Sequence, residues 1–123
     1  MKRVIAVDFD GTLCANMWPK IGEPNRELIA QLIEEQKNGT VIILWTCRSR
    51  RMLREAVKWA KEQGLTFDYV NKNEPERIKA YNNDSRKISA DVYIDDRAAA
   101  FSYGKRLNLG GKKDGKGDQE PGV

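Results

Sequence analysis

Short runs of hydrophobic residues alternate along the chain with segments in which hydrophobic residues recur at every third or fourth position. The short runs have no polar face, which is typical of strands in a sheet covered on both sides. The periodic segments have the spacing of one helix face. We predict strands over residues 3–7, 40–46, 66–70 and 91–94, and helices over residues 26–37, between Ser49 and Gly64, and over residues 76–81. This order favours an α/β fold: a single doubly wound, Rossmann-like parallel sheet with helices on both faces.

Signals at the helix ends support these boundaries. Asn25 precedes the first helical segment and Ser49 precedes the second, and both residue types cap helix N-termini. Gly39 and Gly64 follow the last periodic residues of the same two segments, where glycine commonly ends a helix.

Two segments lack periodicity. Residues 11–25 contain glycine and proline, which predicts an irregular loop or a small hairpin. Residues 110–123 are rich in glycine and have no aromatic residue, so we expect a disordered tail. The expected organisation is one folded domain over residues 1–109 followed by this tail.

The composition narrows the chemistry. With 123 residues, 40% of them hydrophobic and 33% charged, the chain has the size and mixture of one globular domain. It has no histidine, which excludes an imidazole general base, a Ser-His-Asp triad and a histidine-rich metal site. Its 22 basic residues against 18 acidic ones give a formal charge of +4. This mild excess favours an anionic partner.

The chain also carries hints about its location. No hydrophobic run approaches the roughly 20 residues that a membrane span needs, and Asp8 interrupts the first run too early for a secretory signal. Cys14 and Cys47 are far apart and have no metal-binding spacing, so we expect reduced thiols. These features predict a cytoplasmic protein without a membrane partner.

Polar residues follow three of the predicted strands. Asp8 and Asp10 follow the first, Thr46 ends the second, and Asp95 and Asp96 follow the last. Ligands of parallel α/β sheets bind at this edge. Carboxylates gathered there repel one another unless a hard divalent cation lies among them, and oxygen ligands in small number suit Mg²⁺. A carboxylate beside Mg²⁺ and a phosphate ester can attack phosphorus and form an aspartyl phosphate.

These residues resemble the four ordered motifs of the haloacid dehalogenase-like (HAD) superfamily, over about residues 3–103. The matching elements are Asp8-Phe9-Asp10-Gly11-Thr12-Leu13, Thr46 at the end of a hydrophobic strand, Lys87, and Asp95-Asp96 after Val92-Tyr93-Ile94.

The resemblance assigns a role to each matching residue. Asp8 would be the nucleophile and a metal ligand, and Asp10 the general acid-base, with its backbone carbonyl also on Mg²⁺. Thr46 would hydrogen-bond the transferring phosphoryl group. Lys87 would hold the nucleophile and phosphoryl oxygens, with Lys79 as the alternative. Asp95 and Asp96 would hold the metal, directly or through water.

The resemblance also implies an open site. HAD enzymes usually insert a cap domain between the first and second or the second and third motifs, and here a predicted helix already occupies each interval. We therefore expect a capless member, which an oligomeric neighbour could cover. The loop around Trp18 could act as a local lid or substrate platform, or could pack on the edge of the core.

Further candidates for substrate binding lie near the motifs. Gly11 and Thr12 allow a sharp turn beside Asp10. Arg48 and Arg50 flank the start of the second helix, where cations oppose the helix dipole. A substrate phosphate or carboxylate would offset that cost, and simple solvation is the alternative.

The sequence thus predicts a Mg²⁺-dependent phosphate monoester hydrolase with a phosphorylated small molecule or macromolecule as substrate. A phosphatase acting on nucleic-acid ends or nucleotides is one alternative. A non-catalytic phosphate- or nucleic-acid-binding module is another. A receiver-like phosphoacceptor domain is the third, although receivers place the acidic pair first, whereas Asp95 and Asp96 come last here.

Overall fold

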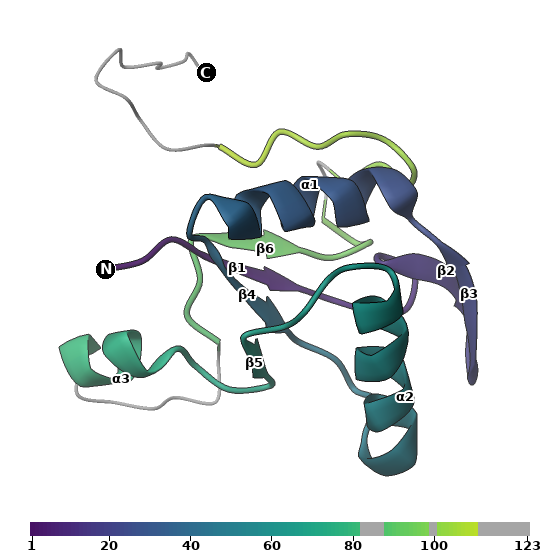
Figure 1. Ribbon diagram of the computed structural model, residues 1–123, viewed down its shortest axis with the longest axis horizontal. Helices are drawn as coiled ribbons and strands as arrows, with labels where there is room; N and C mark the ends of the chain where they lie inside the picture. Colours follow the sequence, from purple (N-terminus) through teal and green to yellow (C-terminus); the bar gives the residue numbers. More distant parts are fainter. Residues whose placement is uncertain (82–87, 99–100, 111–123) are drawn as a thin grey trace.

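The computed structural model describes residues 1–81, 88–98 and 101–110 (Figure 1). Lys87 and residues 111–123, which include most of the predicted tail, lie outside this part of the chain. The elements in chain order are β1 (Val4–Val7), β2 (Cys14–Met17), β3 (Lys20–Pro24), α1 (Arg26–Lys37), β4 (Val41–Leu44), α2 (Arg50–Glu62), β5 (Tyr69–Val70), α3 (Pro75–Tyr81) and β6 (Val92–Ile94).

Four of the strands form a parallel sheet in the order β5-β4-β1-β6, which confirms the predicted α/β class with a parallel sheet. The chain steps outward from β1 to β4 to β5, and then returns to the other side of β1 for β6. The central strand β1 is therefore paired on both sides. Its register aligns Val7 with Leu44 of β4 and with Ile94 of β6.

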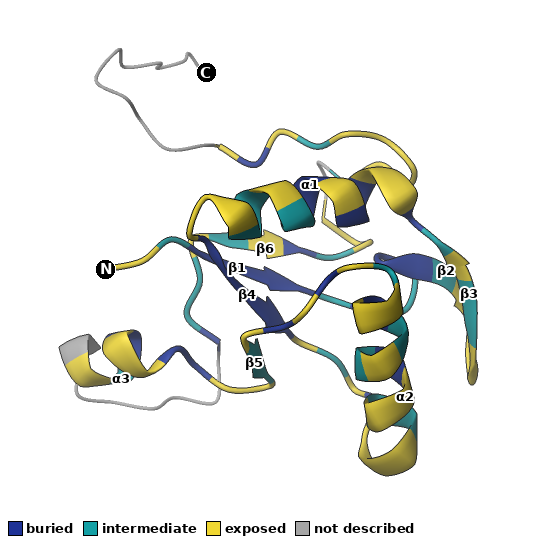
Figure 2. Ribbon diagram, in the orientation of Figure 1, coloured by how far each residue is buried: buried dark blue, intermediate teal, exposed yellow. Residues whose placement is uncertain are grey.

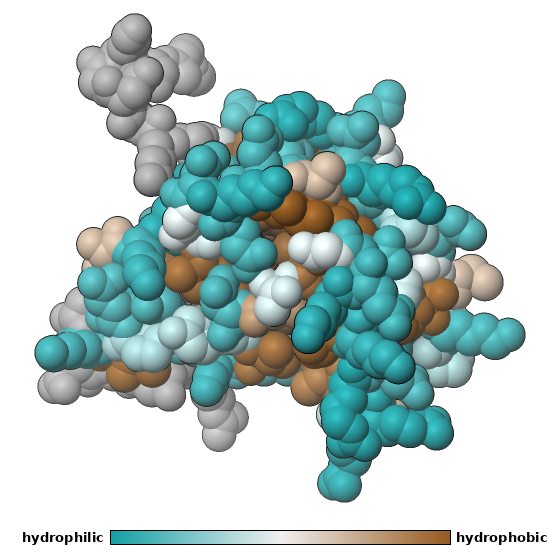
Figure 3. All heavy atoms as spheres, in the orientation of Figure 1, coloured by the Kyte–Doolittle hydropathy of each residue, from teal (hydrophilic) through white to brown (hydrophobic). Residues whose placement is uncertain are grey.

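The two faces of the sheet have different hydrophobic clusters. Side chains of α1 and α2 pack with Ile5 and Val7 of β1 on one face. The opposite face carries Val4 and Ala6, which pack with Ile88 from the segment before β6. All four residues of β1 are buried, whereas the outer faces of α1 and α2 are exposed (Figure 2). Hydrophilic residues cover α2, and hydrophobic residues are visible between α1 and α2 (Figure 3).

Two aspartates fix the edge strands to their neighbours at the start of the sheet. The backbone N–H of Asp68 donates to the carbonyl of Ile42 (2.8 Å), and the Asp68 carboxylate accepts from the N–H of Ile42 (2.8 Å). Asp91 repeats this arrangement with Val4, again at 2.8 Å for both bonds. Each aspartate lies just before its edge strand and thereby sets the register of that strand.

The described C-terminal segment runs along α1 (Figure 1). Gln31 of α1 donates to the carbonyl of Leu107 (2.6 Å) and accepts from its N–H (2.9 Å). Leu109 is buried in the core beside α1. Within the described part of the chain, no helix combines the length and the hydropathy that crossing a membrane requires.

Several local predictions are confirmed and others need correction. The first helix has the predicted bounds, and the Asn25 side chain accepts from the N–H of Leu28. Residues 14–24 form the small hairpin β2–β3. The Ser49 side chain makes no capping hydrogen bond, although Ser49 is the N-cap residue of α2. The third strand is only Tyr69–Val70, because Asp68 turns its side chain back to β4.

We predict that Asp68→Ala lowers the free energy of unfolding by about 1 kcal/mol, because the N–H of Ile42 loses its acceptor. Asp68→Asn keeps an acceptor oxygen and should retain most of the stability. Urea unfolding of both variants measures the difference. Equal losses in the two variants would contradict this role for the carboxylate.

Candidate functional site

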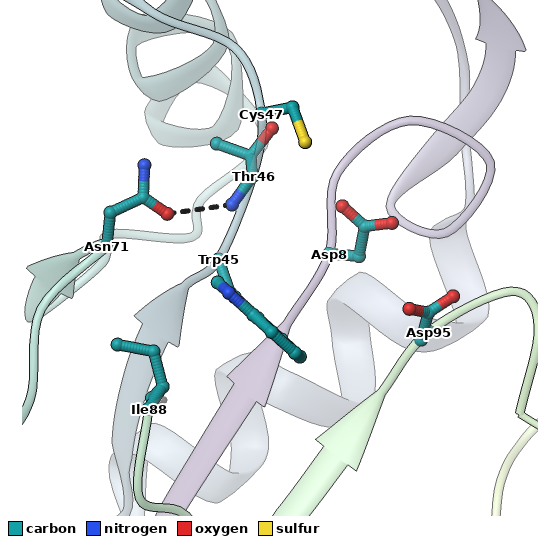
Figure 4. Close-up of a pocket in the computed structure, with 7 residues that line it drawn as sticks. All are labelled: Asp8, Trp45, Thr46, Cys47, Asn71, Ile88 and Asp95. Atoms are coloured by element: carbon teal, nitrogen blue, oxygen red, sulfur yellow. Dashed lines mark hydrogen bonds between the residues drawn. The ribbon is translucent and has the colours of Figure 1, made fainter. Parts of the chain in front are cut away.

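A pocket opens at the edge where β1, β4 and β6 end. The ladder continues past the strands: the N–H of Asp8 donates to the carbonyl of Ile94 (3.0 Å), and that of Trp45 donates to the carbonyl of Val7 (2.9 Å). Residues that follow the three strands are thereby held side by side. The pocket has a volume of about 410 Å³ and is lined by Asp8, Trp45, Thr46, Cys47, Asn71, Ile88 and Asp95 (Figure 4).

Two carboxylates of the pocket lining, those of Asp8 and Asp95, lie close to a third, that of Asp96. Asp8, Asp95 and Asp96 each offer an oxygen, and these oxygens lie within 4.8 Å of one another. Asp8 is half-buried, and burial together with repulsion from Asp95, Asp96 and Asp10 raises its pKa from 3.8 to about 6. Burial and Asp95 also raise the pKa of Asp96. A set of oxygen ligands this close fits a hard divalent cation such as Mg²⁺.

A tight turn after Asp8 brings Asp96 close to the backbone. The carbonyl of Phe9 accepts from the N–H groups of Thr12 (3.1 Å) and Leu13 (2.9 Å). Gly11 has a φ of 82°, and a Cβ at this position would lie 2.4 Å from Oδ2 of Asp96. A side chain at position 11 would therefore displace one member of the acidic cluster, so Gly11 shapes the site through its lack of a side chain.

The fourth carboxylate, that of Asp10, is bound by Arg48. Nε of Arg48 donates to Oδ2 of Asp10 (2.9 Å), and Nη2 donates to Oδ1 (2.7 Å), a bidentate pair. The Arg48 side chain has no exposed surface. The hydrogen bond to Asp10 raises the pKa of Arg48, so this guanidinium stays charged. The expectation that Arg48 binds a substrate anion is corrected: its partner is Asp10.

Aromatic rings enclose the same guanidinium. Its central carbon lies 5.1 Å from the ring centre of Phe9 and 5.0 Å from that of Trp18. Nη2 also donates to the carbonyl of Lys20 (3.1 Å), so Arg48 fastens the hairpin β2–β3 to Asp10. Trp18 is exposed at the tip of this hairpin but does not line the pocket. Its role as a local lid or substrate platform stays a prediction, and its ring contacts Arg48.

Two hydrogen bonds, each between a backbone N–H and a side-chain oxygen, hold Thr46 in position. Its N–H donates to Oδ1 of Asn71 (2.8 Å; Figure 4), and its hydroxyl oxygen accepts from the N–H of Arg48 (3.1 Å). Because Oγ1 already accepts one hydrogen bond, the hydroxyl hydrogen can be donated to a ligand in the pocket. Asn71 has a φ of 53°, a conformation that asparagine tolerates better than most residues.

The remaining predicted residues lie in different places. Thr12 is fully buried, so its side chain does not meet a substrate, which corrects that assignment. Arg50 is exposed at the start of α2 with a φ of 51°, outside the pocket lining. Lys79 lies on α3. The position of this helix is shown by its Arg77, which donates to the carbonyl of Lys2 (3.2 Å) just before β1. That contact is at the opposite end of β1 from the pocket. Lys87 lies outside the described residues.

Sequence reasoning missed Trp45, Asn71 and Ile88 as parts of the pocket. Trp45 directly precedes Thr46, and Asn71 directly follows β5. The rule that ligands bind where parallel strands end could have identified both residues. Ile88 gave no such signal, because it precedes β6 and does not follow the end of a strand. Only the tertiary structure brings it to the pocket.

The raised pKa of Asp8 predicts a pH-dependent stability of the metal-free protein. Above pH 6 the folded protein must hold an unfavourable charge at Asp8, whereas below pH 3.8 this carboxyl is protonated in both folded and unfolded states. Asp8→Asn should therefore stabilise the metal-free protein at pH 8 by about 1 kcal/mol, which allows for solvent screening. The gain should shrink towards pH 4.

Urea unfolding of wild type and Asp8→Asn in a chelator, at several values between pH 4 and pH 8, measures this difference. A gain that is the same at every pH would contradict the assignment, because the shape of the side chain and not its charge would then be responsible.

Most of the chain is similar to a known protein structure. No protein-family model matches the chain, and no curated protein does. A solved structure, that of a conserved protein coded by a locus from Bacteroides thetaiotaomicron, is similar to it with a TM-score of 0.70 and 38% sequence identity. The similarity covers 80% of this chain and 79% of that one. The chain therefore belongs to the same family as this conserved Bacteroides thetaiotaomicron protein.

Proposed function

We propose that this protein is a Mg²⁺-dependent phosphate monoester hydrolase of the HAD-like type, which acts through an aspartyl phosphate on Asp8. The observation that carries the proposal is the meeting of Asp8 with Asp95 and Asp96 within 4.8 Å at an open pocket. In the absence of a cation the three carboxylates repel one another. Burial is the larger cause of the raised pKa of Asp8, and this repulsion adds to it.

Mg²⁺ would be held by Asp8, Asp95 and Asp96. The donors are all carboxylate oxygens, which this cation prefers, and the close approach of Asp96 to Gly11 keeps the third donor beside the other two. Bound there, the cation would neutralise charge on the phosphate and so allow an anionic nucleophile to approach. Asp10 does not contribute a carboxylate, because Arg48 binds both of its oxygens.

The chain's own residues perform the two chemical steps. An oxygen of Asp8 forms a bond to phosphorus while the bond from phosphorus to the ester oxygen breaks, and the leaving oxygen takes up a proton. Water then attacks the phosphorus of the acyl phosphate, loses a proton, and releases phosphate and the Asp8 carboxylate. Thr46 donates its hydroxyl hydrogen to a phosphoryl oxygen in both steps, and Lys87 is the proposed cationic partner of those oxygens.

Asp10 is the proposed acid-base group, and Arg48 determines its position. As a carboxylate bound by Arg48, Asp10 is held ready to accept the proton of the attacking water. Donation of a proton to the leaving oxygen requires Asp10 in its protonated form, which weakens its bond to Arg48. Arg48 therefore acts through Asp10 and does not itself touch the substrate.

The architecture is part of the proposal. We infer a doubly wound sheet without a cap domain. This inference is supported by the return of the chain from β5 to β6 across β1 and by the small hairpin β2–β3 that connects β1 to α1. An open pocket of this kind accepts substrates of varied shape. We also propose a cytoplasmic location, since Cys14 and Cys47 are both free thiols.

Phosphate release tests the proposal directly. Wild-type protein with Mg²⁺ should hydrolyse a generic aryl phosphate, and a chelator should abolish the reaction. Asp8→Asn should lower kcat by at least about a thousandfold, because it removes the nucleophile. Folded wild-type protein that releases no phosphate from any of a panel of aryl, sugar and nucleotide phosphates would refute the function.

Arg48→Lys tests the positioning of Asp10. Lysine keeps the charge but loses the bidentate geometry, so we expect kcat to fall about tenfold or more with little change in KM. Arg50→Lys, an exposed arginine outside the pocket, is the matched control and should leave both constants unchanged. A raised KM with unchanged kcat in Arg48→Lys would instead indicate substrate binding by Arg48.

A further inference from the structure

An aromatic ring forms one wall of the pocket beside the proposed nucleophile. Trp45 lines the pocket together with Asp8 and retains 38% of its accessible surface. Figure 4 shows its ring between Asp8 on one side and Ile88 on the other. A large hydrophobic side chain left exposed in a pocket is available for contact with a ligand.

The Trp45 ring is held in place. Its backbone N–H bonds to the carbonyl of Val7 (2.9 Å), which fixes the start of the side chain. Its ring meets that of Tyr93 edge to face, with centres 5.9 Å apart and planes at 65°. Tyr93 is fixed in turn, because its hydroxyl accepts from the N–H of Ala90 (3.0 Å) and donates to the carbonyl of Ile88. A ring that is already ordered loses little entropy when a ligand stacks on it.

The other walls near Trp45 offer few polar groups. Ile88 is apolar and almost fully buried, and Oδ1 of Asn71 is already bound to the N–H of Thr46. Among the described lining residues, the Asn71 amide nitrogen is thus the main polar group on this side of the pocket. A sugar would need several hydrogen-bond partners for its hydroxyls, whereas a flat ring needs a stacking surface and at most one or two polar contacts at its edge.

We propose that Trp45, Ile88 and Asn71 form a subsite for a planar aromatic ring carried by the phosphate monoester. This inference rests on the proposed function, since it places the phosphate at Asp8 and Thr46. The ring stacks on Trp45, and the Asn71 amide nitrogen donates to a polar atom at the ring edge. Ile88 is 2% exposed and supports the subsite from the core side. The substrate class is a small aryl phosphate or a nucleotide, both of which carry such a ring.

Binding of two matched phosphonates tests the subsite without any turnover. Benzylphosphonate and cyclohexylmethylphosphonate have the same charge, number of heavy atoms and linker, and neither can be hydrolysed. They differ in that only the benzyl ring is planar and aromatic. We expect wild-type protein with Mg²⁺ to bind benzylphosphonate about fivefold more tightly, as measured by titration calorimetry. Equal affinities, or tighter binding of the cyclohexyl compound, would overturn the proposal.

Variants assign the preference to Trp45. Trp45→Leu keeps an apolar side chain without a ring and should abolish the preference for the benzyl compound, whereas Trp45→Phe should keep most of it. Tyr103→Leu is the control, because Tyr103 is an exposed aromatic residue outside the pocket lining, and it should keep the full preference. A preference that survives in folded Trp45→Leu would contradict the role of this ring. If Trp45→Leu does not fold, the wild-type comparison alone decides.

The same titrations separate the two sources of the ring. The non-hydrolysable phosphonate analogues of adenosine 5′-monophosphate and of ribose 5-phosphate, used as competitors of benzylphosphonate, differ in that only the first carries a nucleobase. Tighter competition by the nucleotide identifies a nucleobase, and equal competition identifies an aryl group close to the phosphate. Because binding is measured without hydrolysis, loss of the benzyl preference refutes the subsite alone. If the protein releases no phosphate from any substrate of the panel, the proposed function is refuted, but binding of the two phosphonates still tests the subsite.

Discussion

The pairing of β1 with a strand on each side is the constraint on which the site depends. Val7 is aligned with Leu44 and Ile94, so the residues that follow these three positions leave the sheet together. Asp8, Thr46 and Asp95 thereby line one pocket although they are far apart in the chain. At the other end of the sheet, Asp68 and Asp91 secure the registers of the edge strands. A shift of one residue in either pairing would separate these groups.

The four aspartates that follow β1 and β6 have two different kinds of surroundings. Asp8, Asp95 and Asp96 lie together, and their mutual repulsion contributes to a raised pKa at Asp8. Asp10, only two residues from Asp8, is bound by a fully buried arginine. The first group is suited to a cation and a phosphate, and the second to holding or moving a proton. Neighbouring carboxylates with different surroundings can carry different roles in one reaction.

Much of the fold could be predicted because local signals agree with the tertiary structure. The helix over residues 26–37 has its cap, its periodicity and its glycine stop in sequence, and the structure has the same bounds. The sequence predicts the third strand over residues 66–70, but its late start at Tyr69 could not be predicted, since the hydrogen bonds between Asp68 and Ile42 decide it. The convergence of Asp8, Asp95 and Asp96 followed from strand ends alone. The pairing of Arg48 with Asp10 did not, because it depends on how the hairpin β2–β3 folds over the first turn.

In the proposed reaction, Asp8 becomes phosphorylated during turnover. Rapid acid quenching of wild-type protein mixed with an aryl phosphate and Mg²⁺, followed by mass spectrometry of its peptides, tests this most directly. We predict a transient phosphoryl group on the peptide that contains Asp8, and its conversion to homoserine at position 8 on borohydride reduction. Phosphate release with no phosphoryl group on Asp8 at any time, or with one on another residue, would contradict the account.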